Sequence, residues 1–224
     1  MITEYEKLEP KGADTWNPLG NERELWHRLR LFLAFDWALQ QIPVPVSQIK
    51  VLDVGCGVGR STRALIEFGV KPENILGIDL RASAIEYAKL FNPGISFRVV
   101  KSFDDWPLEA SFHLCVQCTA FSSIKGSAMR LSLAQMMEKM VINNGYIFWW
   151  DRILANDFAG TDVLDPAQFY KNSTILGKLS VPLKPSIAES LKIQGHFVEL
   201  LLPRIQKYLG FHSTHTMALF KKNL

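Results

Sequence analysis

From residue 49 onward, hydrophobic positions follow two different periods in turn. Short apolar runs of strand length alternate with amphipathic segments in which apolar residues recur every three or four positions. The predicted strands are 49–55, 75–80, 95–100, 112–118 and 145–151, and the predicted helices are 60–69, 83–91 and 128–141. Because the connections are short, this alternation predicts a parallel sheet covered by helices on both faces.

The two ends of the chain follow a different pattern. A polar arm over 1–20 precedes an amphipathic helix over 21–41, with Asn21 as its expected N-cap. We expect residues 1–45 to form an arm and a helix that covers the site as a lid or packs on the sheet edge, and 46–224 to form the main domain. The last part is predicted to contain strands over 174–181 and 212–222 and an interrupted helix over 186–209.

Composition narrows the class of protein. The chain has 224 residues, of which 48% are hydrophobic and 21% charged, and its net charge of +3 is not concentrated in runs. These values favour a soluble, cytoplasmic protein without a nucleic-acid footprint. No apolar run approaches the ~20 residues that span a bilayer, and the polar start does not resemble a signal peptide. Three cysteines without metal spacing indicate a reducing compartment.

The stretch "VLDVGCGVGRST" at 51–62 places a glycine-rich turn between a strand and a helix. Such a turn lets the backbone approach a nucleotide closely, and the helix start offers free N–H groups. The glycines follow the spacing GxGxG at Gly55, Gly57 and Gly59, whereas the dinucleotide fingerprint would need its third glycine at Arg60. A phosphate-binding Gly-Lys-Ser/Thr sequence is also missing from the loop.

An acid ends the next strand. Asp79 closes "ILGID", twenty positions after Gly59. A carboxylate at this place can accept hydrogen bonds from both ribose hydroxyls of an adenosine. The alternative is that Asp79 only caps the helix that follows.

The sequences "DVGCGVG" and "GIDL" together resemble the class I S-adenosylmethionine (SAM) dependent methyltransferases over about residues 50–150. The resemblance implies a Rossmann-like three-layer α/β sandwich. Its sheet has seven strands, six of them parallel and the last antiparallel. SAM is the implied cofactor, and no metal is implied. The implied cofactor-binding residues are Asp53, Gly55, Cys56, Gly57, Gly59, Ser61, Thr62, Asp79, Leu80, Ser102, Phe103, Gln117 and Cys118.

Three positions depart from the pattern of the methyltransferases. Lys101 replaces the acid that accepts from the adenine amino group, and lysine cannot accept a hydrogen bond. We expect Ser102 or Asp104 to meet the adenine edge, with Phe103 against the ring. His113 replaces an acid in the fourth strand and is interpreted as structural, and Asn144 replaces a glycine before the fifth strand.

Cofactor motifs say little about the methyl acceptor. The segment after the fourth strand, "QCTAFSS", lacks the Asn/Asp-Pro-Pro-Tyr/Phe motif that methylates exocyclic amines of bases or protein glutamine. Cys118 is interpreted as a pocket residue rather than a nucleophile. The C-terminal part, including Pro182, Leu183 and Thr214-His215, resembles bacterial methyltransferases of polysaccharide and cell-envelope biosynthesis clusters.

This second resemblance favours a hydroxyl of a sugar, glycan or other small molecule as acceptor, so we expect an O-methyltransferase. Two alternatives stay open: a non-catalytic SAM-binding subunit, and a methyltransferase that acts on protein or nucleic acid. The oligomeric state is not predicted.

A base is expected near the acceptor, since a sugar hydroxyl is a very weak acid. The candidates are Asp151, His215 and His212. Asp151 ends the fifth strand and is expected to orient a histidine or to act as base itself. His212 and His215 have opposite parity on one predicted strand, so only one of them faces the pocket. Arg28, like Arg23, is a candidate partner for the methionine carboxylate of the cofactor.

Overall fold

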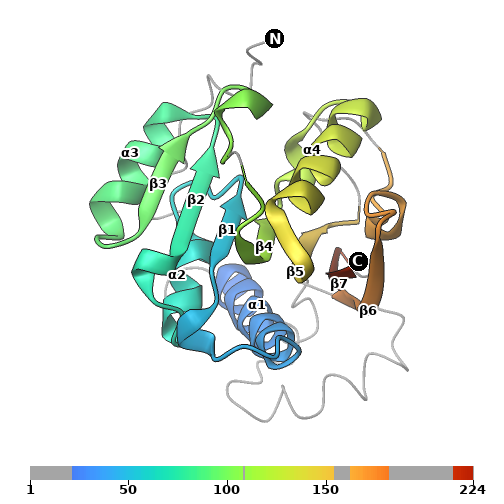
Figure 1. Cartoon of the computed structure of the whole chain (residues 1–224), viewed down its shortest axis with the longest axis horizontal. Helices are drawn as coiled ribbons and strands as arrows, with labels where there is room; N and C mark the ends of the chain where they lie inside the picture. Colours follow the sequence, from blue (N-terminus) through green and yellow to red (C-terminus); the bar gives the residue numbers. More distant parts are fainter. Residues whose placement is uncertain (1–21, 108, 154–161, 182–213, 224) are drawn as a thin grey trace.

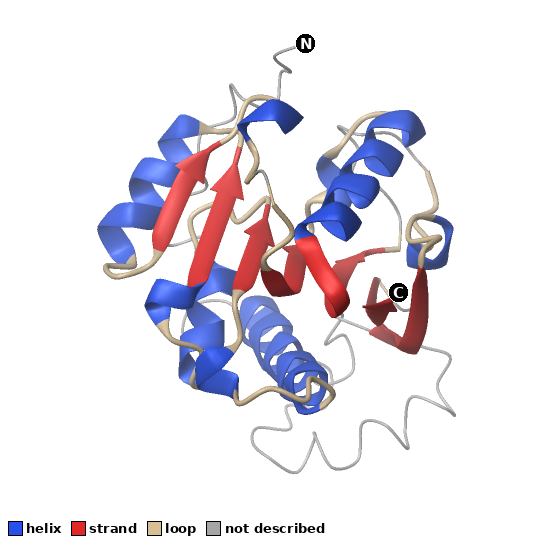
Figure 2. Cartoon of the chain, in the orientation of Figure 1, coloured by secondary structure: helices blue, strands red, loops and turns tan. Residues whose placement is uncertain are grey.

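The computed structural model describes residues 22–107, 109–153, 162–181 and 214–223, and it is a sheet between two layers of helices (Figure 1). Figure 2 shows the same alternation of strands and helices along the chain that the sequence predicts. The strands are β1 (Val51–Val54), β2 (Ile75–Asp79), β3 (Ser96–Val99), β4 (Phe112–Cys118), β5 (Val141–Arg152), β6 (Ser173–Val181) and β7 (His215–Lys222). The helices are α1 (Glu22–Gln40), α2 (Arg60–Glu67), α3 (Ala82–Phe91) and α4 (Ser127–Met140).

The sheet has seven strands in the order β3-β2-β1-β4-β5-β7-β6. Neighbours from β3 through β5 are parallel, while β7 is antiparallel to both β5 and β6. The prediction of six parallel strands and an antiparallel last strand is therefore confirmed. In this order the carboxyl ends of β1, β2, β4 and β5 meet at one edge of the sheet, and β7 begins at that same edge.

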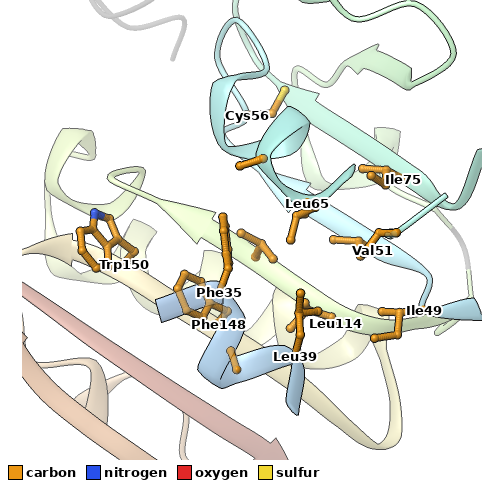
Figure 3. Close-up of a cluster of buried hydrophobic side chains, with 14 of the residues drawn as sticks. Phe35, Leu39, Ile49, Val51, Cys56, Leu65, Ile75, Leu114, Phe148 and Trp150 are labelled. Atoms are coloured by element: carbon orange, nitrogen blue, oxygen red, sulfur yellow. The ribbon is translucent and has the colours of Figure 1, made fainter. Parts of the chain in front are cut away.

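Each face of the sheet has its own apolar core. On one face, α1, α2 and α3 cover side chains such as Val51, Leu114 and Phe148, and Figure 3 shows Phe35 of α1 against Phe148. The ring centroids of these two phenylalanines are 4.7 Å apart. On the other face, α4 covers a second core that includes Trp149 and Phe121. Because α1 buries its Phe35, Ala38 and Leu39 in the first core, residues from both predicted units share that core.

Several local predictions can be compared with these elements. The helix predicted over 83–91 begins one residue earlier, because α3 starts at Ala82 with Arg81 at the N-cap position and no side-chain cap. Asn144 has φ +60°, the left-handed conformation that asparagine tolerates in place of glycine. The arm over 1–20, Asn21, the helix over 186–209, Pro182, Leu183 and His212 lie outside the described residues.

Candidate functional site

The glycine loop joins β1 to α2 at the carboxyl edge of the sheet. The N–H groups of Gly55 and Cys56 both donate to the carbonyl of Ile78, at 2.8 and 3.0 Å, so the loop is fixed against β2. Gly55, Gly57 and Gly59 all have positive φ, a conformation that side chains rarely adopt. A Cβ on Gly55 would lie 2.8 Å from the Cβ of Ala120. At Gly57 the nearest atom to such a Cβ would be Arg81 Nη2 at 3.5 Å, which is ordinary van der Waals contact with the end of a flexible side chain.

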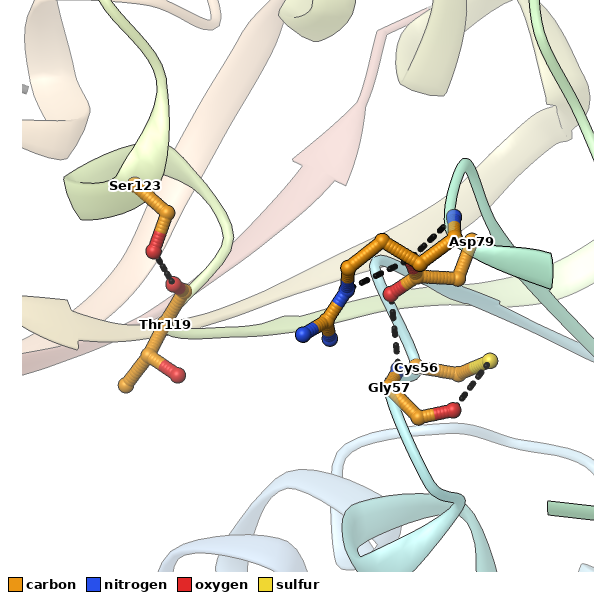
Figure 4. Close-up of polar contacts among 6 residues, drawn as sticks. Cys56, Gly57, Asp79, Thr119 and Ser123 are labelled. Atoms are coloured by element: carbon orange, nitrogen blue, oxygen red, sulfur yellow. Dashed lines mark hydrogen bonds and ion pairs between the residues drawn. The ribbon is translucent and has the colours of Figure 1, made fainter. Parts of the chain in front are cut away.

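Asp79 holds the loop from the end of β2 (Figure 4). Its Oδ2 accepts from the N–H of Gly57 at 2.9 Å, and its Oδ1 accepts from the N–H of Arg81 at 2.9 Å. The Arg81 side chain also donates through Nε to Oδ1 at 3.3 Å. Asp79 is thus aimed at the loop and does not act only as a helix cap. Leu80, beside it, is partly buried.

Asp53 lies beneath the loop and is fully buried. Its Oδ2 accepts from Ser61 Oγ at 3.1 Å and from Thr62 Oγ1 at 2.6 Å, which ties β1 to the first turn of α2. Its Oδ1 has no hydrogen-bond partner among the described residues. Burial raises the pKa of Asp53 to about 6, although the two hydroxyls act in the opposite direction.

The end of β4 lies beside the glycine loop. Gln117 is fully buried; its Oε1 accepts from the N–H of Ala120 at 3.1 Å, while its Nε2 finds no partner in the described part of the chain. Burial raises the pKa of the Cys118 thiol well above its usual range, which disfavours a thiolate nucleophile. Burial does the same for Cys56, whose Sγ lies 3.7 Å from the carbonyl of Gly57. Burial therefore disfavours the thiolate form of both cysteines.

The residues present fit an adenosine-bearing cofactor. Apart from the two chain neighbours of Gly57, no backbone atom of the described residues lies within 4 Å of the position of a Cβ there, only the end of the flexible Arg81 side chain. A residue without a side chain keeps the loop backbone accessible at this point. Two buried polar atoms, Asp53 Oδ1 and Gln117 Nε2, lie at the ends of neighbouring strands without protein partners in the described residues. Buried polar groups are almost always hydrogen-bonded, so their presence here indicates a bound ligand or ordered water.

Residues 101–105 form a tight turn after β3. Ser102 caps this turn: its Oγ accepts from the N–H of Asp104 at 3.2 Å. Asp105 Oδ2 accepts from the N–H groups of Lys101 and Ser102 at 2.7 and 2.9 Å, and these bonds lower the pKa of Asp105. The Ser102 hydroxyl and amide are therefore both used within the turn, whereas the side chain of Asp104 is exposed.

The sequence predicts that residues 117–119 face the methyl donor, but it does not predict that Thr119 is strained. Thr119 follows β4 directly and has φ +64°, an outlier for a β-branched side chain. Its N–H donates to the carbonyl of Trp150 at 2.7 Å, and its carbonyl accepts from the hydroxyls of Ser122 and Ser123, both at 3.3 Å. The bond between Thr119 and Ser123 is drawn in Figure 4. The serines in "TAFSS" were the only signal for this turn.

Asp151, near the end of β5, fixes the same turn through its carboxylate. Its Oδ2 accepts from the N–H groups of Phe121 and Ser122 at 2.9 and 3.3 Å, and Oδ1 accepts from the N–H of Arg152. Asp151 is fully buried and pairs across the sheet with Thr216, whereas His215 pairs with Arg152. Because successive side chains of a strand point to opposite faces, Asp151 and His215 are on different faces. The expectation that Asp151 orients a histidine is therefore wrong for His215.

His215 instead belongs to a cluster with His27 and Trp150. The Trp150 indole Nε1 donates to His27 Nε2 at 3.1 Å, and the two histidine rings are 5.7 Å apart between centroids. Thr214 Oγ1 lies 3.0 Å from His215 Nδ1. We refer to His27, Trp150 and His215 as the histidine cluster. It lies at the carboxyl end of β5 and brings α1 and β7 together beside the end of β4, since Trp150 pairs with Cys118.

Two other sequence interpretations concern His113 and Arg28. His113 lies at the start of β4, and its Nδ1 accepts from the N–H of Lys50 at 3.0 Å, so its structural role is confirmed. Arg28 donates to Glu67 at 2.9 Å and lies over the ring of Phe32. Arg28 thus has a partner at the far end of α2 rather than at the glycine loop, and its pairing with the cofactor carboxylate stays a prediction.

The buried carboxyls make stability depend on pH. Burial raises the pKa of both Asp53 and Asp151 from 3.8 to about 6, so the folded state retains protons that the unfolded chain releases. The free energy of unfolding should therefore fall as pH rises from about 4 to about 6, by on the order of 2–3 kcal/mol for each group.

Urea unfolding of the cofactor-free protein at pH 4.5, 5.5 and 7 measures this dependence. Asp53→Asn should show a clearly smaller decrease than the wild type, since one titrating group is gone. Asp104→Asn is the matched control, because its exposed carboxyl should leave the decrease unchanged. An equal decrease in wild type and Asp53→Asn would contradict the assignment.

Comparison with known proteins agrees with this geometry. Residues 51–141 match the family described as a methyltransferase domain. The fold is similar to that of N-methyltransferase NodS from Bradyrhizobium japonicum WM9 in complex with S-adenosyl-L-homocysteine (SAH). The TM-score is 0.67 at 16% identity, covering 98% of this chain and 97% of NodS. An S-adenosylmethionine dependent methyltransferase from Mesorhizobium loti gives a TM-score of 0.56 at 14% identity, over 84% and 98% of the two chains. No curated protein matches the chain.

The fold is thus a Rossmann-like methyltransferase fold, and its residues 51–141 match a methyltransferase domain. Among the residues that the structure describes, no three or more histidines, cysteines or carboxylates are grouped to hold a metal ion. In the same part of the chain, none of the helices has the length and apolarity needed to cross a bilayer.

Proposed function

We propose that this chain, with its methyltransferase domain at 51–141, transfers a methyl group from SAM to a hydroxyl of a sugar, glycan or other small molecule. One observation carries the proposal: the glycine loop with Asp79 and the histidine cluster lie at the same edge of the sheet. The carboxyl ends of β1, β4 and β5 are in register there, from Val54 through Gln117 to Trp149. A cofactor on the loop and a base from the histidine cluster would meet at the end of β4.

We assign the cofactor-binding residues from the geometry of the glycine loop and of the strand ends beside it. Asp79 would accept from the ribose hydroxyls, and the loop from Gly55 to Gly59 would pass under the methionine part. Asp53 keeps the loop in place through Ser61 and Thr62 and presents its unpaired Oδ1 to the ligand or to a bridging water. Phe103 would lie against the adenine ring, with the exposed Asp104 at its edge.

The acceptor side is assigned to His215. SAM, when bound, supplies an electrophilic methyl group, so the protein must align the acceptor and take up its proton. We assign the tautomer in which His215 Nδ1–H donates to Thr214 Oγ1, which lies 3.0 Å away, because this tautomer places the basic lone pair on Nε2. In this assignment Nε2 takes the acceptor proton, and the buried Trp150 with the half-buried His27 limits the access of water. Asp151 and Thr119 act as positioning residues that shape the turn beneath the acceptor.

The choice of a sugar or glycan hydroxyl is supported by the resemblance of the C-terminal part to methyltransferases of polysaccharide clusters. An amine is the second candidate, and the similarity to an N-methyltransferase over nearly the whole chain favours it. A neutral histidine can take the proton from either class of acceptor. The two candidates therefore differ in substrate and not in the residues that we assign.

A panel of acceptors separates these candidates. Conversion of SAM to SAH is measured with sugars, lipid-linked glycans, small amines, a protein extract and nucleic acid. The proposal expects turnover with a hydroxyl compound and none with amines of matched shape. Turnover only with amines would show the second candidate. Tight SAM binding with no turnover on any acceptor would favour a non-catalytic SAM-binding subunit.

Replacing Asp79 tests the cofactor assignment directly. Asp79→Ala should weaken SAM and SAH equally, by ~1.5–3 kcal/mol, the range for hydrogen bonds to a charged group. The ribose is the same in both ligands, so calorimetric titrations should give the same loss of affinity. A loss confined to one of the two ligands would contradict the role of Asp79 as the ribose acceptor.

A further inference from the structure

Arg81 places a cation on the carboxylate that we assign to the ribose. It is two residues beyond Asp79, at the N-cap position of α3. Its Nε lies 3.3 Å from Asp79 Oδ1, and its Nη2 lies 3.5 Å from the position that a Cβ on Gly57 would take. The side chains of Arg81 and Asp79 are 13% and 4% exposed, so the ion pair is shielded from water. The guanidinium therefore lies over the middle of the glycine loop.

The hydrogen-bonding capacity of Asp79 is limited. A carboxylate offers about four lone-pair positions. Asp79 already accepts from the N–H of Gly57, from the N–H of Arg81 and from Arg81 Nε, which leaves one. A ribose that donates from both hydroxyls needs two. One of the three present donors must therefore leave when the ribose binds.

The Arg81 side chain is the donor that can leave. The N–H of Gly57 is part of a loop fixed to Ile78, and the N–H of Arg81 belongs to the start of α3. Only Arg81 Nε is at the end of a flexible side chain, and its bond to Asp79 is the longest of the three. Moving it breaks an ion pair without moving the backbone.

We propose that Arg81 is an affinity-setting residue: its guanidinium competes with the cofactor ribose for Asp79 and weakens the binding of SAM and SAH alike. This inference rests on the proposed role of Asp79. Because the product SAH carries the same ribose, the competition also favours release of the product. Arg81 acts on the ribose-binding carboxylate and does not touch the reacting atoms.

Calorimetric titration of SAH into Arg81→Met tests the competition. Methionine keeps an unbranched side chain and the backbone N–H bond to Asp79 while removing the charge and the Nε donor. We expect SAH to bind about two- to tenfold more tightly, as the loss of a partly shielded ion pair implies. Arg81→Lys is the matched control and should stay within about twofold of the wild type, since an ammonium can still pair with Asp79. Unchanged or weaker binding of SAH to Arg81→Met would overturn the proposal.

A double variant shows whether the effect passes through Asp79. In the Asp79→Ala background, Arg81→Met should bring no tightening, because there is no carboxylate to compete for. Tightening that persists there would mean that the arginine only obstructs the pocket, and would also overturn the proposal. Asp79→Ala alone tests the proposed function: if it leaves SAH affinity unchanged, the ribose assignment fails, whatever Arg81→Met does.

Discussion

Gly57→Val should abolish SAM binding in a protein that still folds. Gly57 has φ +55°, and its N–H donates to Asp79 Oδ2. Valine is strained at this φ, and its two methyl groups would lie where the cofactor has to approach the loop backbone. We expect no heat of binding for SAM or SAH at concentrations that saturate the wild type. Near-normal affinity in a folded Gly57→Val protein would contradict the cofactor assignment.

The backbone strain that valine introduces at Gly57 needs a separate control. A substitution at Gly94 provides this control. Gly94 has φ +91°, and a Cβ there would meet its nearest atom, in Pro72, at 3.5 Å, the same separation as at Gly57. It lies between α3 and β3, at the edge of the sheet opposite the glycine loop. Gly94→Val should therefore lower the melting temperature about as much as Gly57→Val while leaving SAM affinity intact. Equal losses of affinity in both variants would mean that strain alone explains the effect.

Local patterns predicted the scaffold well because they are set by nearest neighbours in the chain. The period of the apolar residues located all seven strands, and β4 was predicted with the bounds 112–118 that the structure has. The glycine loop and Asp79 could also be identified, since a strand, a turn and the next strand fix their relative positions. These features need no knowledge of how distant segments meet.

Contacts between distant segments could not be predicted in the same way. His27 and His215 are separated by most of the chain, and only the packing of α1 against β5 and β7 brings their rings together. Asp151 was placed correctly at the end of its strand, but its face depends on the register with β7. The left-handed backbone of Thr119 likewise results from bonds to Trp150 and to the following serines. The role of each of these residues depends on a distant contact, and the sequence does not show which residues are in contact.

His215→Ala should lower turnover at least ~100-fold with SAH affinity nearly unchanged, the loss typical for removal of a general base. In the proposed site His215 lies in the histidine cluster beside the acceptor. The residues assigned to the cofactor belong to the glycine loop and β2, so the variant should still bind SAH. The matched control is His113→Ala, because His113 lies at the opposite edge of the sheet and accepts from the N–H of Lys50. This control should cost stability but leave turnover per folded molecule unchanged.

The dependence on pH separates His215 from Asp151. With His215 as base, the wild-type rate should rise with pH as the imidazole loses its proton, and His215→Ala should remove that rise. Asp151→Asn should also lower turnover, but by displacing the turn at Phe121 and Ser122, so its melting temperature should fall as well and the rise with pH should remain. If His215→Ala methylates its acceptor at the wild-type rate from pH 6 to 9, His215 is not the base. Alignment of the acceptor above the strained turn at Thr119 would then have to carry the reaction.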